Sequence, residues 1–331
     1  GRALLHLDRL HAAAGDGVFG ARRGDRSRRR DLGGIAALME LCFGDTLDGP
    51  GWGAVREMQR LSRSGPLLWV MGTVAPAWQL GFVWIENGRV IGNASTQPSE
   101  HDRHTWLIAN VAVHPDYRRR RMARALTEAA MRLALDSGAT QILLQVNQNN
   151  TAAHRLYEAL GFQTLGAHTV WERMTGFRPQ PAALPGIDIR PARAAEWEDV
   201  FRFVSTYRPE GFAWLKPLRS GDWRPSLARA FNNFFAGAQE EQWLAVEPVN
   251  NQIVGLAKID TGFSQSDQVC VLSHPDWASR LERPLLVTAL RRLGNRPWSV
   301  RIDHPAGEAE AALQDLGFRR LPTLVWMEKQ L

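Results

Sequence analysis

Residues 111–123 read VAVHPDYRRRRMA, and this stretch decides the fold. Its first three residues, Val111, Ala112 and Val113, end an apolar run that predicts a strand over 106–113. His114 and Pro115 then turn the chain, and apolar residues at helical spacing predict a helix from about 120 to 137. The sequence therefore predicts a strand, a short loop and a helix in direct succession.

The start of that helix is suited to bind an anion. Backbone N–H groups in the first turn of a helix have no partner within the helix, and the helix dipole adds positive charge there. The four arginines at 118–121 add charge that suits a diphosphate. The same arginines are also typical of a solvated helix start, so this loop alone leaves both interpretations open.

A second informative stretch begins about thirty residues later. Residues 146–162 read VNQNNTAAHRLYEALGF, and they predict a helix over 151–160, ended by Gly161, after an apolar strand over 141–146. Together the two stretches resemble motifs A and B of the GNAT superfamily of acetyl-CoA-dependent N-acetyltransferases. The resemblance covers residues 30–175 well and 186–331 faintly. It implies an α/β (α+β) fold of two tandem GNAT-like domains, each a mixed, mostly antiparallel twisted sheet flanked by helices.

The resemblance also implies which residues hold the cofactor, acetyl-CoA (coenzyme A). Val111, Ala112 and Val113 would offer backbone groups to the pantetheine arm. Asn150 would contact this arm or help to shape its slot, and Ala153 also belongs to the cofactor-binding residues. The pyrophosphate would be held by the backbone N–H groups of Arg118, Arg119, Arg120, Arg121, Met122 and Ala123. Tyr157 would be catalytic, protonating the leaving thiolate as a general acid, although a core tyrosine would look the same in the sequence.

Two positions depart from the family pattern. Arg121 stands where the family has its first loop glycine, whereas Ala123 keeps the second small residue. A long side chain there would either crowd the diphosphate or pair with it. Relatives often carry a glutamate as general base near the position of Thr105, which cannot serve. The nearby acidic residues and histidines are typical of solvated loops, so no base is assigned among Glu86, Glu100, His101, Asp102 and His104.

The chain repeats itself. His114-Pro115-Asp116 recurs as 274–276, and the words LGF at 160–162 and VW at 170–171 recur as 316–318 and 325–326, in the same order. In the second copy Leu281 replaces the loop glycine, Glu282 adds a negative charge and Pro284 removes a donor. The equivalents of Asn150 and Tyr157 are an alanine and a leucine. We therefore expect a duplicated domain whose second copy is a structural or substrate-shaping partner.

These signals divide the chain into four segments. We expect a basic extension with a possible first strand over 1–30, the cofactor-binding domain over 31–175, a proline-rich linker over 176–186, and the degenerate domain over 187–331. Helices are expected from Asp31 and over 57–64, and a hairpin over 80–94 turns at Asn87-Gly88. In the second half, strands are expected over 187–190, 243–247, 252–259, 269–272 and 300–302, with helices over 283–293 and 308–316.

Composition excludes several classes of protein. The 331 residues are 44% hydrophobic and 22% charged, as in an ordinary two-domain globular protein. The longest weakly polar run, over 66–78, is shorter than a membrane helix, and no secretory signal is evident. Two cysteines without ligand spacing give no metal site and no disulfide framework, so a cytoplasmic location is expected. The net charge is +6, and only three of the 40 basic residues are lysines, so we do not expect nucleic-acid binding.

The leading hypothesis is an N-acetyltransferase. It would move an acetyl group from acetyl-CoA to a primary amine of a small molecule or a peptide N-terminus, by direct attack in a ternary complex. A non-catalytic acyl-CoA-binding or regulatory protein is the alternative, favoured by Arg121 and the missing base. A nucleic-acid-associated protein using the arginine arm at 22–30 ranks third, because that arm lacks interleaved aromatic residues. The acceptor and the oligomeric state stay unassigned.

Overall fold

The computed structural model describes residues 28–44, 49–63, 81–99, 102–174, 178–209, 218, 220–224, 226, 239–262, 266–294 and 296–331. The extension expected over 1–30 lies outside this part of the chain, apart from 28–30, which begin the first helix. The described residues form two compact units. The first comprises 1–146, 150–164 and 327–331, and the second comprises 147–149 and 165–326.

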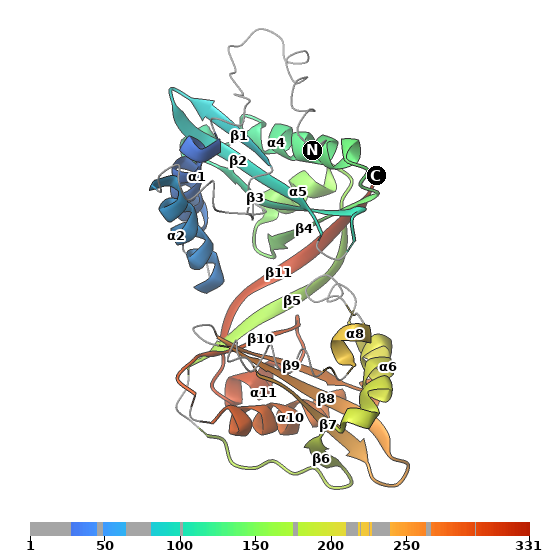
Figure 1. Cartoon of the computed structure of the whole chain (residues 1–331). Helices are drawn as coiled ribbons and strands as arrows, with labels where there is room; N and C mark the ends of the chain where they lie inside the picture. The colour runs from blue at the N-terminus through green and yellow to red at the C-terminus, as the bar shows by residue number, and fades with distance from the viewer. Residues whose placement is uncertain are drawn as a thin grey trace. The chain divides into compact units, whose positions relative to one another are not determined.

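The first unit is a mixed sheet with helices on both faces (Figure 1). Its strands are β1 (Gly81–Glu86), β2 (Arg89–Pro98), β3 (Thr105–Val113) and β4 (Gln141–Asn147). Its helices are α1 (Arg28–Phe43), α2 (Gly49–Arg63), α4 (Met122–Asp136) and α5 (Thr151–Glu158). The strand order is β1-β2-β3-β4-β11, with β1–β2 and β2–β3 antiparallel and β3–β4 parallel. The predicted hairpin is confirmed, and Asn87 and Gly88 have the positive φ angles, 49° and 76°, that its turn requires.

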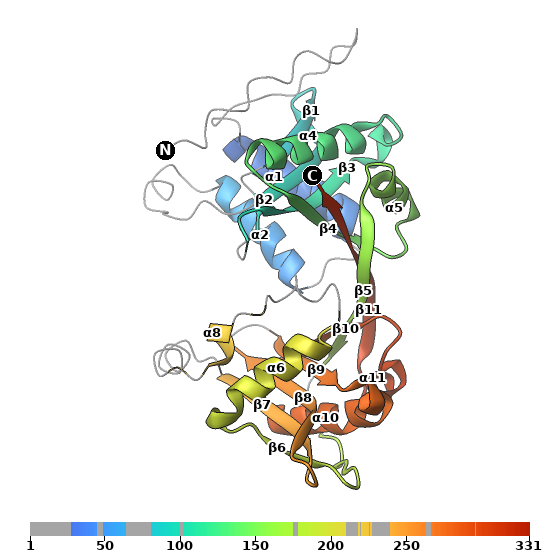
Figure 2. The same ribbon diagram turned by 90° about the vertical axis from the view of Figure 1, so that its right-hand side faces the viewer.

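Alternation along β2 and β3 places helices on opposite faces of this sheet. Ile91 and Val113 pack with Met122 and Leu126 of α4, whereas the adjacent Val90 and Ala112 pack with α1. Figures 1 and 2 show α4 lying against β1–β3. This packing fixes where α4 begins relative to the end of β3, and that junction carries the predicted cofactor site.

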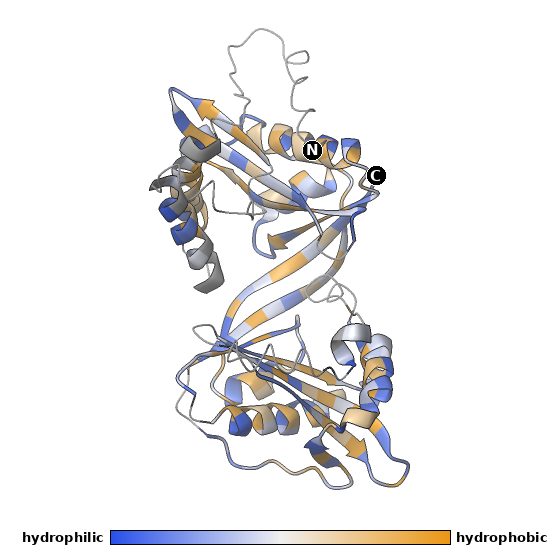
Figure 3. Cartoon of the chain, viewed as in Figure 1, coloured by the Kyte–Doolittle hydropathy of each residue, from blue (hydrophilic) through white to orange (hydrophobic). Residues whose placement is uncertain are grey.

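The second unit repeats this plan. Its strands follow the order β11-β5-β10-β9-β8-β7-β6. Their bounds are β5 (Gln163–Arg173), β6 (Asp188–Pro191), β7 (Gln239–Glu247), β8 (Gln252–Thr261), β9 (Asp267–Ser273), β10 (Val300–Pro305) and β11 (Arg319–Gln330). The helices are α6 (Trp197–Tyr207), α8 (Ser220–Trp223), α10 (Ala278–Leu293) and α11 (Glu310–Asp315). Helix α10 packs on one face of β7 and β8, and α6 packs on the other. Because both faces are covered, the apolar residues of these strands form continuous runs, such as 243–246 and 253–257, and Figure 3 shows these strands partly in the hydrophobic colour.

The strand β11 is divided between the units. Residues 319–326 belong to the second unit, and residues 327–331 belong to the first. In the first unit, Lys329 Nζ donates to the Leu160 carbonyl oxygen at 2.6 Å, where α5 ends, and Gln141 Nε2 donates to a Glu328 carboxylate oxygen at 2.6 Å. The first unit is therefore completed by residues that follow the whole second unit in the sequence.

Several predicted bounds were wrong. Helix α2 begins at Gly49 rather than Glu57. The sequence pattern predicts a strand only over 170–174, whereas β5 begins at Gln163. Helix α10 begins at Ala278 rather than Arg283 and contains Pro284, because burial of Leu281 and Leu285 outweighs the one backbone hydrogen bond that proline removes. The amphipathic helix α6 was not predicted. None of the helices in the described residues is long and apolar enough to cross a membrane.

Candidate functional site

The loop between β3 and α4 is built on a tight turn. Pro115–Tyr117 form one turn of 3-10 helix, and the Asp116 N–H donates to His114 Nδ1 at 3.3 Å. The His114 ring is buried, and its Nε2 lies 3.0 Å from Arg89 Nη2 on β2. The turn is thereby tied to the sheet, which holds the following residues, 118–123, at the end of β3.

The predicted phosphate-binding residues present a row of free donors. Among the described residues, the N–H groups of 119–124 make no backbone hydrogen bond, whereas the Arg118 N–H donates to Pro115 and the Ala125 N–H to Arg121. Arg119 and Arg121 have left-handed backbone angles, with φ of 63° and 61°, and Arg121 is the N-cap of α4. Left-handed residues next to a helix start turn successive N–H groups toward one point, which makes a concave anion site.

The four arginine side chains of the loop divide into two pairs. Arg118 Nε donates to the Val113 carbonyl oxygen at 3.2 Å, and the Arg120 guanidinium lies 5.0 Å from the ring centre of Tyr117. The side chains of Arg119 and Arg121 are exposed and have no partner among the described residues. Two guanidinium groups are thus free to meet an anion held by the backbone.

The end of β3 has one unpaired edge. The parallel pairing of β3 with β4 stops at Ile108 and Leu144, although β3 continues to Val113 and β4 to Asn147. A bulge at Asn110, whose φ is 56°, shifts the pairing of β3 with β2 at this point. Ala112 and Val113 keep their β2 partners, Asn93 and Gly92, whereas Val111 lies in the bulge. The edge of 111–113 that faces β4 has no strand partner, as the addition of an extended arm would require.

Two of the predicted residues lie on α5. Asn150 is its N-cap, and its side-chain oxygen accepts from the Ala153 N–H at 3.2 Å. This bond gives Asn150 a structural role in starting the helix. Its amide NH2 group remains available, so the cap is compatible with the predicted contact to the pantetheine arm. Ala153 is half-buried in the same turn.

Tyr157 lies on the buried face of α5. Its side chain is 6% exposed and its ring meets that of Phe162 edge-on, with centroids 5.9 Å apart. Burial raises the pKa of its phenol to about 12. No described residue forms a hydrogen bond with the hydroxyl. One turn earlier on α5, the buried Nε2 of His154 has no hydrogen-bond partner among the described residues. His154 was not among the predicted site residues, although its spacing of three residues from Tyr157 places both on one face of the helix.

The base candidates near the start of β3 are held in structural contacts. The Thr105 hydroxyl donates to Asp102 at 2.7 Å, and hydrogen bonds from the His104 N–H and Thr105 lower the pKa of the Asp102 carboxyl. Thr105 and Val113 are the two ends of β3, which is about 26 Å long at 3.3 Å per residue. The base candidates at the start of β3 therefore lie far from the predicted cofactor-binding edge at 111–113. Glu100 and His101 lie outside the described residues. Glu86 hydrogen-bonds Tyr117, whose phenol pKa is raised chiefly by that bond.

The second unit keeps the turn and lacks the loop. His274 Nδ1 accepts from the Asp276 N–H at 3.2 Å, as His114 does from Asp116, but α10 begins at Ala278 immediately after the turn. The four residues that separate turn from helix in the first unit have no counterpart. Leu313, at the position equivalent to Tyr157, is fully buried.

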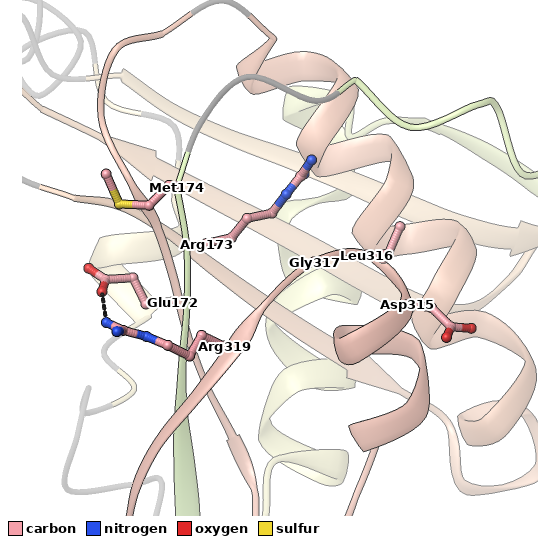
Figure 4. Close-up of a pocket in the computed structure, with 7 residues that line it drawn as sticks. All are labelled: Glu172, Arg173, Met174, Asp315, Leu316, Gly317 and Arg319. Carbon is pink, nitrogen blue, oxygen red and sulfur yellow. Dashed lines mark hydrogen bonds and ion pairs between the residues drawn. The ribbon is translucent and has the colours of Figure 1, made fainter.

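A cavity of about 590 Å³ in the second unit lies apart from these residues. It is lined by the end of β5, the end of α11 and the start of β11, and Figure 4 shows Glu172 facing Arg319 across an ion pair of 3.4 Å. The described residues of its lining include two arginines and two acidic residues, and none of the predicted cofactor-binding residues.

The chain is thus an α/β protein in which a parallel strand pair, β3 and β4, parts beside a helix start with several free N–H donors. Residues 55–162 match the acetyltransferase (GNAT) family. This part of the chain is similar to that family, and the predicted fold class of two tandem GNAT-like domains is confirmed.

Two solved structures share the fold of this chain. A GCN5-related N-acetyltransferase from Sphaerobacter thermophilus aligns over 94% of this chain and 95% of its own, with a TM-score of 0.62 and 18% identity. A tandem GNAT protein from the clavulanic acid biosynthesis pathway aligns over 91% and 95%, with a TM-score of 0.53 and 17% identity. At these identities the likeness shows the fold alone.

Sequence relatives match only part of this chain. The N-alpha-acetyltransferase 30 of Schizosaccharomyces pombe is 36% identical over 87 residues, which are 25% of this chain and 57% of the relative. The [ribosomal protein bS18]-alanine N-acetyltransferase of Escherichia coli is 36% identical over 83 residues, 25% of this chain and 54% of the relative. The chain thus spans little more than half the length of these curated relatives.

Proposed function

We propose that the first unit is an N-acetyltransferase that uses acetyl-CoA to acetylate the primary amine of a small molecule or a peptide N-terminus by direct attack. The observation that carries the proposal is the junction of β3 and α4. There the unpaired edge at 111–113 runs directly into the free N–H groups at 119–124. An extended arm that ends in a diphosphate matches this order of groups.

The residues present suit coenzyme A. The N–H groups of 119–124 would hold the pyrophosphate, and the unpartnered guanidinium groups of Arg119 and Arg121 would balance its charge. The edge of Val111 to Val113 would pair with the amide groups of the pantetheine arm. When bound, acetyl-CoA supplies the thioester that an amine attacks.

Tyr157 would assist at the sulfur. Because burial raises its pKa to about 12, the phenol keeps its proton throughout the neutral range. A thiol has an ordinary pKa of about 8.5, so complete proton transfer from this phenol to a thiolate is uphill. We therefore infer that Tyr157 stabilises negative charge on sulfur by donating a hydrogen bond, while the proton that reaches sulfur comes from the attacking amine.

The relatives support an α-amino group as the acceptor. Their names describe an N-alpha-acetyltransferase, an alanine N-acetyltransferase and, for a mouse protein 30% identical over 96 residues, an N-acetylaspartate synthetase. We further propose a cytoplasmic location, because Cys42 and Cys270 are both free thiols. The second candidate is a non-catalytic acyl-CoA-binding protein, which is favoured by the absence of an assigned base among the described residues near α5.

A panel of amines with thiol release as the readout tests the proposal. Peptides with free or blocked N-termini, single amino acids and polyamines are incubated with the full chain and acetyl-CoA. Thiol release that requires a free α-amine, and that falls in Tyr157→Phe, supports transfer. Coenzyme A binding by calorimetry without release for any acceptor supports the non-catalytic protein, and the absence of binding refutes both.

A further inference from the structure

Three side chains in the second unit converge in a way that acetyl transfer does not use. Glu282 lies in the second turn of α10, His304 on β10, and Glu308 in the loop between β10 and α11. One ligand atom from each, a carboxylate oxygen or an imidazole nitrogen, lies within 4.8 Å of the other two. Three separate segments therefore direct metal-binding groups at one point.

Two of these groups are buried without a partner. Glu282 is 8% exposed and His304 is 6% exposed. Among the described residues, neither makes a side-chain hydrogen bond or an ion pair, and His304 Nε2 is completely buried. Burying an unpaired carboxylate costs several kcal/mol, so folded proteins pair such groups or bind a cation between them.

The cluster has two carboxylates and no cationic partner. Among the described residues, neither Glu282 nor Glu308 forms an ion pair with a lysine or an arginine. Imidazole nitrogen and carboxylate oxygen are groups that bind divalent metals.

We propose that Glu282, His304 and Glu308 bind a divalent ion of the Zn²⁺ class in the second unit. One nitrogen and two carboxylate oxygens are a ligand set that Zn²⁺ accepts, at about 2.0–2.2 Å each, with water in the fourth position on the exposed side of Glu308. Ligand atoms around a tetrahedral ion are about 3.3 Å apart. The exposed Glu308 side chain can supply most of the small closure needed.

The site occupies a defined place in the fold. The parallel pairing of β9 with β10 ends at Val269 and Ile302, two residues before His304. In the first unit the parallel pairing of β3 with β4 likewise ends before either strand does. Glu282 lies in the helix that follows the His274 turn. The repeat that lacks the arginine loop thus carries a cation site where its strands part. Bound metal would join α10, β10 and the loop before α11.

Binding is tested on the untagged full chain after dialysis against a chelator. Zn²⁺ is titrated against a competing indicator, Co²⁺ is followed by its visible absorption, and unfolding temperature is recorded with each ion. The variants are Glu308→Gln, which changes an exposed side chain, His304→Gln and Glu282→Gln. Asp315→Asn, an exposed carboxylate at the end of α11, is the matched control.

We expect one Zn²⁺ per chain in the wild type and in Asp315→Asn, with a higher unfolding temperature as Zn²⁺ increases. Each ligand variant should weaken binding at least about tenfold and lose this response. Metal-free Glu282→Gln should unfold at the wild-type temperature or above it, because a buried unpaired charge is removed. Absence of stoichiometric binding, or equal affinity in Glu308→Gln and Asp315→Asn, would overturn the proposal.

Discussion

Replacing Arg121 by glycine should change stability and cofactor binding in opposite directions. Arg121 has a φ of 61° at the N-cap of α4, and its side chain forms no capping hydrogen bond. A left-handed backbone costs a residue with a Cβ about 1–2 kcal/mol, and glycine avoids this cost. Glycine also loses about 0.5–1 kcal/mol more conformational freedom on folding. The variant should therefore be between unchanged and about 1.5 kcal/mol more stable.

Binding should weaken in the same variant. The guanidinium of Arg121 is exposed and without a partner, so it can reach a diphosphate held by the N–H groups of 119–124. Losing one charged hydrogen bond costs about 1.5–3 kcal/mol, or roughly 10- to 150-fold in affinity. The salt dependence of binding should also become shallower, because an exposed ion pair is screened within about 10 Å.

Calorimetry with coenzyme A at two salt concentrations, combined with thermal unfolding, measures both effects. Arg121→Ala separates them, because it removes the charge and keeps the left-handed strain. Arg132→Ala, an exposed change about 16 Å further along α4, controls for net charge. If Arg121→Gly binds coenzyme A more tightly than wild type, the Arg121 side chain crowds the loop. If Arg121→Ala binds as tightly as wild type, the guanidinium does not contribute to binding. Either result refutes the argument from charge.

Four further outcomes follow from the structure. Tyr157→Phe removes one hydrogen-bond donor to the developing thiolate, so it should lower turnover by about 10²–10³-fold and leave coenzyme A affinity within about twofold, as steady-state rates and calorimetry can check. An unchanged rate with chemistry limiting would remove Tyr157 from the mechanism. Coenzyme A should bind once per chain. Because residues 327–331 belong to the first unit, the stoichiometry of binding is measured by calorimetry on the full chain, and two equivalent sites would contradict the assignment. Lys329→Met should lower the unfolding temperature through loss of a charged hydrogen bond worth about 1.5–3 kcal/mol, whereas the exposed Gln330→Ala should not. The ion pair with Arg190 lowers the pKa of Glu196 from 4.5 to about 2. The stabilisation that this ion pair gives the folded protein is therefore complete above pH 4.5 and is lost as the pH falls toward 2. Urea unfolding at several pH values should show that Glu196→Gln loses less stability in acid than the wild type.

Local signals explain what the sequence could predict of the fold. Asn87-Gly88 requires positive φ angles, which specify the hairpin, and Gly161, with a φ of 87°, marks where α5 ends. The start of α10 was missed because Pro284 reads locally as a helix breaker, whereas the buried contacts of Leu281 and Leu285 come from the tertiary structure. Helix α6 was missed although Val200, Phe203 and Val204 share one face.

The candidate site was predictable to the extent that it follows motifs. The motifs placed the loop at 118–123 and Tyr157 on a helix, and the roles of these residues stay predictions. The backbone angles at Arg119 and Arg121 are left-handed, a conformation that glycine adopts without strain. This is a second physical reason for a glycine in the family pattern, besides the close approach of phosphate to the backbone. The sequence analysis expected no metal site. Glu282, His304 and Glu308 come from three elements without a ligand motif, so only the fold brings them together.

The division of β11 sets an order of synthesis. The ribosome completes α5 long before it reaches residues 327–331, and the intervening stretch of about 160 residues takes roughly ten to thirty seconds to translate. During that interval the edge of β4 and the carbonyl group at the end of α5 await their partners. A nascent chain thus finishes the second unit before the first. A protease that cuts the linker at 178–185 would leave the first unit assembled from two separate polypeptides.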